Sequence, residues 1–161
     1  MRASLGVVKK EIRILGIDLC NPNLVIGAVV RGGLYLDGVV AFPERFRTGQ
    51  LAETIRQTKY YPELKAIMVH GSNGDLNFEI IERITRLPTI RISLDRPTVG
   101  RDARVFGEGR DKLWIRTGLD KSSTEKVLRS TRSIGRLPEP VRVAHLLAKL
   151  HISGRISQDK G

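Results

Sequence analysis

The chain has 161 residues, of which 28 are basic, 17 are acidic and 40% are hydrophobic. A length close to the ~150 residues of a typical domain predicts a single domain over residues 1–161, and the apolar content excludes a wholly disordered chain. The net charge of +11 favours an acidic partner, DNA or RNA before a membrane surface.

Two further features bear on where the protein acts. No apolar run approaches the ~20 residues needed to cross a bilayer, so we expect no membrane association. The one cysteine, Cys20, cannot form an internal disulfide, and no secretory leader pattern opens the sequence. We therefore expect a cytoplasmic protein, and the sequence leaves its oligomeric state open.

The first third of the sequence predicts three antiparallel strands, over residues 11–20, 24–31 and 34–42. Apolar residues alternate along the first strand, and Asn21-Pro22-Asn23 has the composition of a turn. Gly32-Gly33 indicates a tight hairpin, because paired glycines accept the positive φ angles that such a turn requires.

The pattern then changes to alternating helices and strands. We expect a helix over 48–58 with Thr48 as its N-cap, a strand over 66–70, a loop over 71–74, a helix over 75–86 and a strand over 88–94. Strands that are separated by helices usually pair in parallel. The middle of the chain therefore predicts parallel strands beside the antiparallel ones.

The last third is harder to interpret. Residues 96–109 are rich in Pro, Gly and Arg, and we expect a partly helical excursion there. A further strand over 113–117, a helix capped by Ser122 or Ser123 and running to about 132, and a last helix from Pro138 to about 150 follow. This order predicts an α/β, ribonuclease-H-like fold with a mixed five- or six-stranded sheet and flanking helices.

Two residues at strand ends are candidates for chemistry. Asp18 lies near the end of an otherwise apolar strand, where an ionised carboxylate is costly unless it is exposed or binds a cation. The alternative is that Asp18 caps the turn that follows. His70 ends a buried-looking strand at a glycine, and its alternative role is a half-buried imidazole bonded to a carbonyl.

Two other candidates are weaker on their own residues. Glu44 follows the third strand and is typical of a solvated loop acid, and His145 lies in an apolar helical context where a histidine is more often structural. Competing signatures are missing: the sequence has no phosphate-binding P-loop, no cluster of zinc-binding thiolates and no nucleophile elbow.

One segment is specific. Residues 135–145, Gly-Arg-Leu-Pro-Glu-Pro-Val-Arg-Val-Ala-His, resemble the R-x-P-E-P-x-R-x-A-[HD] signature of the endonuclease V superfamily. They are most similar to its small archaeal relatives, a domain-of-unknown-function family labelled endonuclease dU. The segments 14–18, 38–44 and 67–71 occur in the same order as the catalytic segments of that superfamily, so the resemblance covers about residues 11–150 and implies a ribonuclease-H-like fold.

The resemblance also implies roles for individual residues. Asp18 matches the first metal-binding aspartate, Glu44 the glutamate after the third strand, and His145 the ligand in the last helix. Asp18, Glu44 and His145 are therefore candidate catalytic residues, and with His70 they are candidate ligands of Mg²⁺ or Mn²⁺. Arg136 and Arg142, near the start of the last helix, are candidate contacts for nucleic-acid phosphates.

The sequence departs from the family pattern at three places. His70-Gly71 stands where the family usually has Asp-Gly, and imidazole suits Mn²⁺, Co²⁺ or Zn²⁺ better than Mg²⁺. Leu94 stands in the region where endonuclease V has a lysine. The Gly32-Gly33 hairpin is too short for the wedge that endonuclease V inserts beside a deaminated base, so deoxyinosine specificity does not carry over.

Two functional hypotheses follow. The first is a divalent-metal-dependent nuclease that hydrolyses phosphodiester bonds in DNA or RNA. The second is a nucleic-acid-binding protein on the same fold whose turnover is impaired by His70 and Leu94. A third, less favoured interpretation is that the positive charge serves solubility alone.

Overall fold

The computed structural model describes residues 2–21, 23–71, 76–97, 102–132 and 134–159, with 152–159 described by their backbone. Seven strands form one sheet: β1 (Arg13–Asp18), β2 (Ile26–Arg31), β3 (Tyr35–Ala41), β4 (Ala66–His70), β5 (Thr89–Ser93), β6 (Arg104–Phe106) and β7 (Leu113–Thr117). The helices are α1 (Thr48–Gln57), α2 (Phe78–Thr85), α3 (Lys121–Thr131) and α4 (Glu139–Asp159). Two short 3₁₀ turns lie at Tyr61–Glu63 and Gly109–Asp111.

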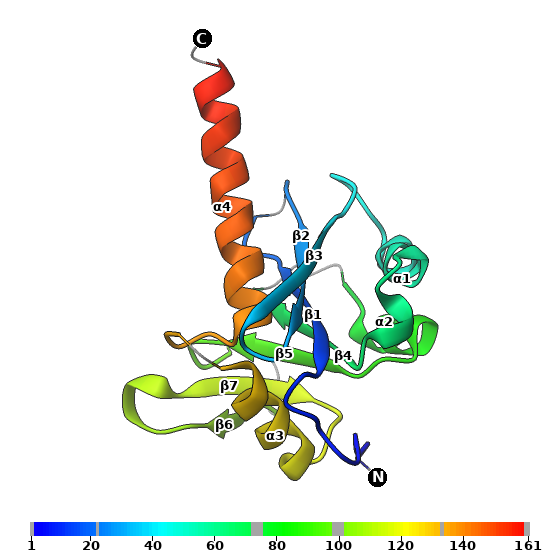
Figure 1. Ribbon diagram of the computed structural model, residues 1–161, viewed down its shortest axis with the longest axis vertical. Helices are drawn as coiled ribbons and strands as arrows, with labels where there is room; N and C mark the ends of the chain where they lie inside the picture. Colours follow the sequence, from blue (N-terminus) through cyan, green and yellow to red (C-terminus); the bar gives the residue numbers. More distant parts are fainter. Residues whose placement is uncertain (1, 22, 72–75, 98–101, 133, 160–161) are drawn as a thin grey trace.

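The strand order is β3-β2-β1-β4-β5-β7-β6 (Figure 1). The predicted antiparallel meander is confirmed, because β2 pairs antiparallel with both β1 and β3. The predicted parallel pairing is confirmed as well, since β4 lies parallel to β1 and to β5. In the hairpin between β2 and β3, Gly32 adopts the positive φ of +62° that the paired glycines predicted.

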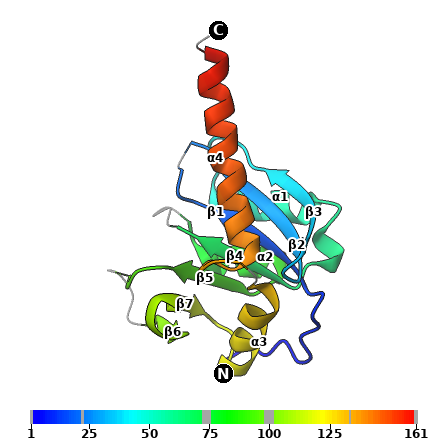
Figure 2. The same ribbon diagram turned by 60° about the vertical axis from the view of Figure 1, so that its left-hand side comes forward.

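Strand β1 lies near the centre of the sheet and is covered on both faces. Ile14 belongs to one apolar cluster and Leu15 to another, as alternation along a strand requires. The cluster on the Leu15 face includes residues of α1, and the cluster on the Ile14 face includes residues of α3 and Val141 of α4. Helices therefore cover both faces of the sheet, and α4 crosses β1 and β2 while its C-terminal half extends beyond them (Figures 1 and 2).

The sheet has seven strands, where the sequence predicts five or six. Strand β6 falls within residues 96–109, where we expected partly helical structure, although 98–101 lie outside the described residues. With only three residues, β6 is too short to show an alternating pattern in the sequence. Strands β7 and β6 are antiparallel to their neighbours, so the parallel part of the sheet ends at β5.

Two N-caps differ from the prediction. Arg47, not Thr48, is the N-cap of α1, and its N–H donates to Gln50 Oε1 at 2.8 Å. Asp120, not Ser122 or Ser123, caps α3 by accepting a hydrogen bond from the Ser123 N–H at 2.6 Å. The observed N-cap of α1 lies one position before Thr48, and that of α3 lies two positions before Ser122.

The last helix also differs at both ends. Pro138 precedes α4, whose first residue is Glu139, and the helix continues to Asp159 instead of ending near 150. Helix α2 begins at Phe78 after the N-cap Asn77, and the predicted loop over 72–74 and helix start at Asp75 lie outside the described residues. Among the helices of the described ranges, none combines the length and apolarity needed to span a bilayer.

Candidate metal centre

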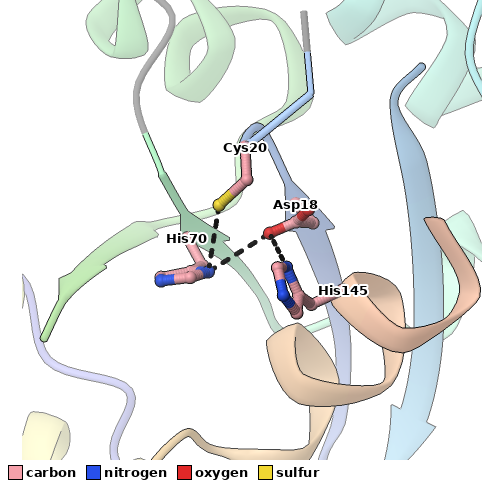
Figure 3. Close-up of side chains that lie close together, drawn as sticks. All are labelled: Asp18, Cys20, His70 and His145. Atoms are coloured by element: carbon pink, nitrogen blue, oxygen red, sulfur yellow. Dashed lines mark hydrogen bonds and ion pairs between the residues drawn. The ribbon is translucent and has the colours of Figure 1, made fainter. Parts of the chain in front are cut away.

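Asp18 and His70 meet at the carboxyl ends of the two central parallel strands. The register of β1 and β4 pairs Asp18 directly with His70. Because side chains alternate along each strand, both lie on the Ile14 face of the sheet, toward α4. The distance from Asp18 Oδ1 to His70 Nδ1 is 3.2 Å (Figure 3). The pairing of two strands therefore brings these groups together without any contribution from a loop.

His145 reaches the same carboxylate from α4. A Cβ atom at Gly16 would lie 2.1 Å from the backbone carbon and oxygen of Pro140, so the start of α4 rests directly on β1. Val141 and Ala144 are fully buried against the sheet, and His145 follows on the same side of the helix. His145 Nδ1 lies 3.2 Å from Asp18 Oδ1, the oxygen that also faces His70 (Figure 3).

Cys20 is the fourth member of the group, and it was not among the predicted site residues. Its Sγ lies 3.6 Å from His70 Nδ1 (Figure 3). The Leu19 N–H donates to the His70 carbonyl at 2.8 Å, which continues the β1–β4 pairing and sets the position of Cys20. The signal that could have indicated Cys20 is its spacing, because residue i+2 from Asp18 continues on the same side of an extended chain.

The charges of the group are set by burial and by neighbours. Burial acts to raise the pKa of the Asp18 carboxyl, but hydrogen bonds from His70 and Cys20 and the charge of His145 outweigh it, so the pKa lies below its ordinary value. Burial and the Asp18 carboxylate raise the pKa of the Cys20 thiol to about 11, against the opposing charge of Lys149. At neutral pH the group therefore holds one buried negative charge beside a neutral thiol.

The group has the composition of a metal centre. One ligand atom each from Asp18, Cys20, His70 and His145 lies within 4.8 Å of the others. The side chains of Asp18 and His70 are 2% and 14% exposed and are largely shielded from water, whereas Cys20 is exposed. This set could hold a divalent cation, but it lacks the several oxygen donors with which Mg²⁺ builds its octahedral shell.

Glu44 is not part of this group. It is exposed and follows β3, and the described residues whose ligand atoms converge do not include it. Its predicted catalytic and metal-binding roles therefore stay predictions that this geometry does not test.

Arg136 and Arg142, predicted to contact phosphates, both bind other groups of the chain. Arg136 Nη2 donates to the Leu94 and Lys112 carbonyls at 2.7 and 2.8 Å, and its Nε donates to the Lys112 carbonyl at 3.0 Å. Arg142 forms a bidentate pair with the buried Glu139, at 2.6 and 2.7 Å. These contacts join the start of α4 to the strands beside it and strengthen its first turn.

The sheet order and helix placement define the class: an α/β protein of the ribonuclease-H-like type, with a candidate metal centre at the carboxyl end of its central strand. Its fold is similar to that of endonuclease V from Streptomyces avermitilis, with a TM-score of 0.54 and 16% identity over 94% of this chain and 86% of that one. A crystal structure of a protein of unknown function from Archaeoglobus fulgidus gives a TM-score of 0.70 and 24% identity over 86% of this chain and 97% of that one.

Sequence relatives identify the family. A UPF0215 protein of Methanopyrus kandleri is 30% identical over 96% of this chain and 98% of its own length. A UPF0215 protein of Methanosarcina acetivorans is 31% identical over 88% of this chain and 91% of its own length. No family model matches the sequence. The chain belongs to the UPF0215 family, which confirms the predicted resemblance to a small archaeal family of unknown function related to endonuclease V.

Proposed function

We propose that this protein is a divalent-metal-dependent nuclease that hydrolyses phosphodiester bonds in DNA or RNA. One observation carries the proposal: Asp18, His70 and His145 converge at the carboxyl end of the central strand of an endonuclease-V-like sheet. In sheets with parallel strands this edge is where ligands and catalytic groups usually lie. The net charge of +11 supports a polyanionic substrate.

The roles of the side chains follow from their positions. Asp18 would supply the buried negative charge that attracts a cation, and His70 and His145 would hold it from the adjacent strand and from α4. A bound divalent ion would polarise the scissile phosphate and make a hydroxide available near neutral pH. In this proposal Glu44, which lies outside the group, binds a water or a second ion, as the family resemblance implies.

Lys149 is a better placed candidate for phosphate binding than Arg136 or Arg142. It is exposed, it lies one helical turn after His145 on α4, and its charge is close enough to Cys20 to affect the pKa of the thiol. Arg136 and Arg142 already bind carbonyl and carboxylate groups of the chain. We therefore assign the first phosphate contact beside the centre to Lys149.

The test is a cleavage assay with labelled single-stranded DNA, duplex DNA and RNA, each incubated with Mn²⁺, Co²⁺, Zn²⁺ or Mg²⁺. Asp18→Asn and His145→Ala should lower the rate by at least ~100-fold, because even groups that only support a metal ligand contribute about 10–100-fold. His151→Ala is the matched control: this exposed histidine of the same helix is not part of the group. Equal cleavage by the wild type and all three variants would point to a contaminating nuclease and reject the proposal.

A second candidate function is nucleic-acid binding without cleavage, and the single carboxylate of the group favours it. The two functions predict different results for His70→Asp. A nuclease limited by its ligand set should gain cleavage in Mg²⁺ when a second oxygen donor is added at this position. A binder should show no cleavage in any variant, together with an affinity that falls steeply as salt rises.

A further inference from the structure

The sulfur of Cys20 distinguishes this centre from a set of oxygen ligands. Cys20 follows the end of β1, is exposed, and is the single cysteine of the chain. Its Sγ nevertheless lies 3.6 Å from His70 Nδ1, and its thiol is also hydrogen bonded to Asp18. Its position relative to His70 is set by the backbone bond from Leu19 to the His70 carbonyl.

Gly71 makes room for this approach. It follows His70 with a φ of +88°, and a Cβ atom built there would lie 3.0 Å from the Cys20 nitrogen and 3.1 Å from Cys20 Sγ. A side chain at position 71 would therefore crowd both the backbone and the thiol of Cys20, in a backbone conformation that L residues rarely adopt. The glycine thus preserves the contact between the two candidate ligands.

The distances match those of a tetrahedral site. With metal bonds of about 2.0–2.1 Å to nitrogen, 2.0–2.2 Å to oxygen and 2.3 Å to sulfur, tetrahedral angles place ligand atoms about 3.4 Å apart for oxygen and nitrogen and about 3.6 Å apart for sulfur and nitrogen. The corresponding distances are 3.2 Å from Asp18 Oδ1 to each imidazole and 3.6 Å from Cys20 Sγ to His70. The other distances in the group reach at most 4.8 Å, so the four atoms could share one ion after an adjustment of up to about 1.2 Å.

The donor types point to one class of metal. Thiolate and imidazole select Zn²⁺ and similar ions, whereas Mg²⁺ requires near-octahedral oxygen coordination. The group offers one carboxylate, two imidazoles and one thiol. We propose that Asp18, Cys20, His70 and His145 bind a single tetrahedral ion of the Zn²⁺ class, with Cys20 Sγ as the fourth ligand.

This inference deepens the proposed function by naming the metal, but it concerns binding and needs no substrate. The test uses purified full-length protein, stripped with a chelator, kept reduced and titrated with Co²⁺. Tetrahedral Co²⁺ gives strong visible absorption, and a thiolate ligand adds a charge-transfer band in the near ultraviolet. Because Cys20 is the single cysteine, this band reports on one side chain.

We expect the wild-type protein to show both absorptions, and micromolar Zn²⁺ but not millimolar Mg²⁺ to abolish them. Cys20→Ser should lose the near-ultraviolet band and keep visible absorption, and its far-ultraviolet circular dichroism should match the wild type because the residue is exposed. His145→Ala should weaken Co²⁺ binding by at least ~10-fold, because even residues that only hydrogen bond to a metal ligand contribute about 10-fold or more to metal affinity. His151→Ala, the control on the same helix, should bind as the wild type does.

Two results would overturn the inference: a wild-type spectrum without the near-ultraviolet band, or displacement of Co²⁺ by millimolar Mg²⁺. The presence or absence of the near-ultraviolet band is measured on the wild-type protein, so this test holds even if a variant fails to fold. The proposed nuclease function fails separately. Tetrahedral Co²⁺ binding without cleavage would reject the nuclease function and support the metal site. Mg²⁺-dependent cleavage without the near-ultraviolet band would support the nuclease function and reject the tetrahedral site.

Discussion

Gly16→Ala tests the contact that brings His145 to Asp18. The added Cβ would lie 2.1 Å from both the carbon and the oxygen of Pro140 and 2.7 Å from the Val141 nitrogen. All three atoms belong to the backbone, so no side-chain rotation can relieve the overlap. The substitution touches none of the four candidate ligands.

The magnitude follows from this geometry. To move from 2.1 Å to an ordinary contact of 3.4 Å, the start of α4 must shift away from β1 by about 1.3 Å. Overpacking of a core costs about 1–3 kcal/mol where side chains can adjust. Because the obstacle here is backbone and Val141 is fully buried, we expect a loss of about 3 kcal/mol or more in the free energy of unfolding.

The assay is urea unfolding followed by circular dichroism, combined with Co²⁺ titration of the folded protein. A shift of about 1.3 Å carries His145 with the helix and should weaken Co²⁺ binding by about tenfold or more. Gly49→Ala is the matched control, because a Cβ there meets nothing within 4 Å and the residue lies in α1. It should leave metal binding unchanged and raise the free energy of unfolding by about 0.5–1 kcal/mol.

A Gly16→Ala protein whose free energy of unfolding lies within about 0.5 kcal/mol of the wild type, the range of a neutral surface substitution, would contradict this prediction. Such a result means that α4 does not rest on β1 at this point. A destabilised protein with unchanged Co²⁺ affinity would refute the second step alone, because the position of His145 would then not depend on the Gly16 contact.

Three further predictions concern the surroundings of the site. Arg136→Ala removes three hydrogen bonds to carbonyls and should lower the free energy of unfolding in urea by about 2–4 kcal/mol; unchanged stability with weaker nucleic-acid binding would instead favour the phosphate contact predicted from the sequence. Lys149→Ala should reduce the slope of log affinity against log salt by about 1 in fluorescence anisotropy, and an unchanged slope would contradict our assignment of the phosphate contact. Asn77→Ala removes the cap that accepts the Ile80 N–H, so it should cost about 1 kcal/mol and lower Tm by about 2–4 °C; a Tm equal to that of the wild type would show that the cap contributes nothing.

The central part of the fold could be predicted because its signals are local. Alternating apolar residues and Gly32-Gly33 indicate the meander, and helices between strands indicate the parallel pairing of β1, β4 and β5. Strand β6 was missed because three residues carry no periodicity. The caps differ from the prediction for local reasons. At α1 the Arg47 N–H donates to Gln50 Oε1, and at α3 Asp120, which precedes the predicted serines, accepts from the Ser123 N–H.

The candidate site was predictable to a different degree for each residue. The meeting of Asp18 and His70 follows from strand ends and could be expected. The family resemblance indicated His145, and the spacing of Cys20 from Asp18 was a weak local signal. The close approach of β1 to Pro140 at Gly16, and of Gly71 to Cys20, are tertiary features that neither signal contains. The engagement of Arg136 by distant carbonyls is likewise absent from its sequence neighbourhood.

The origin of the Asp18–His70 contact suggests how the centre obtained its ligand set. Backbone pairing puts residue 70 beside Asp18 on one face whatever side chain it carries, so a change of type there alters the chemistry without altering the fold. With a carboxylate at position 70, two negative charges would lie side by side and require a cation rich in oxygen ligands. With an imidazole there, one buried charge is neighboured by nitrogen and sulfur, and the same backbone favours a softer ion. We therefore expect the residue at the end of β4 to have a large effect on the metal preference of the proposed centre, with Cys20 and His145 close enough to contribute ligands.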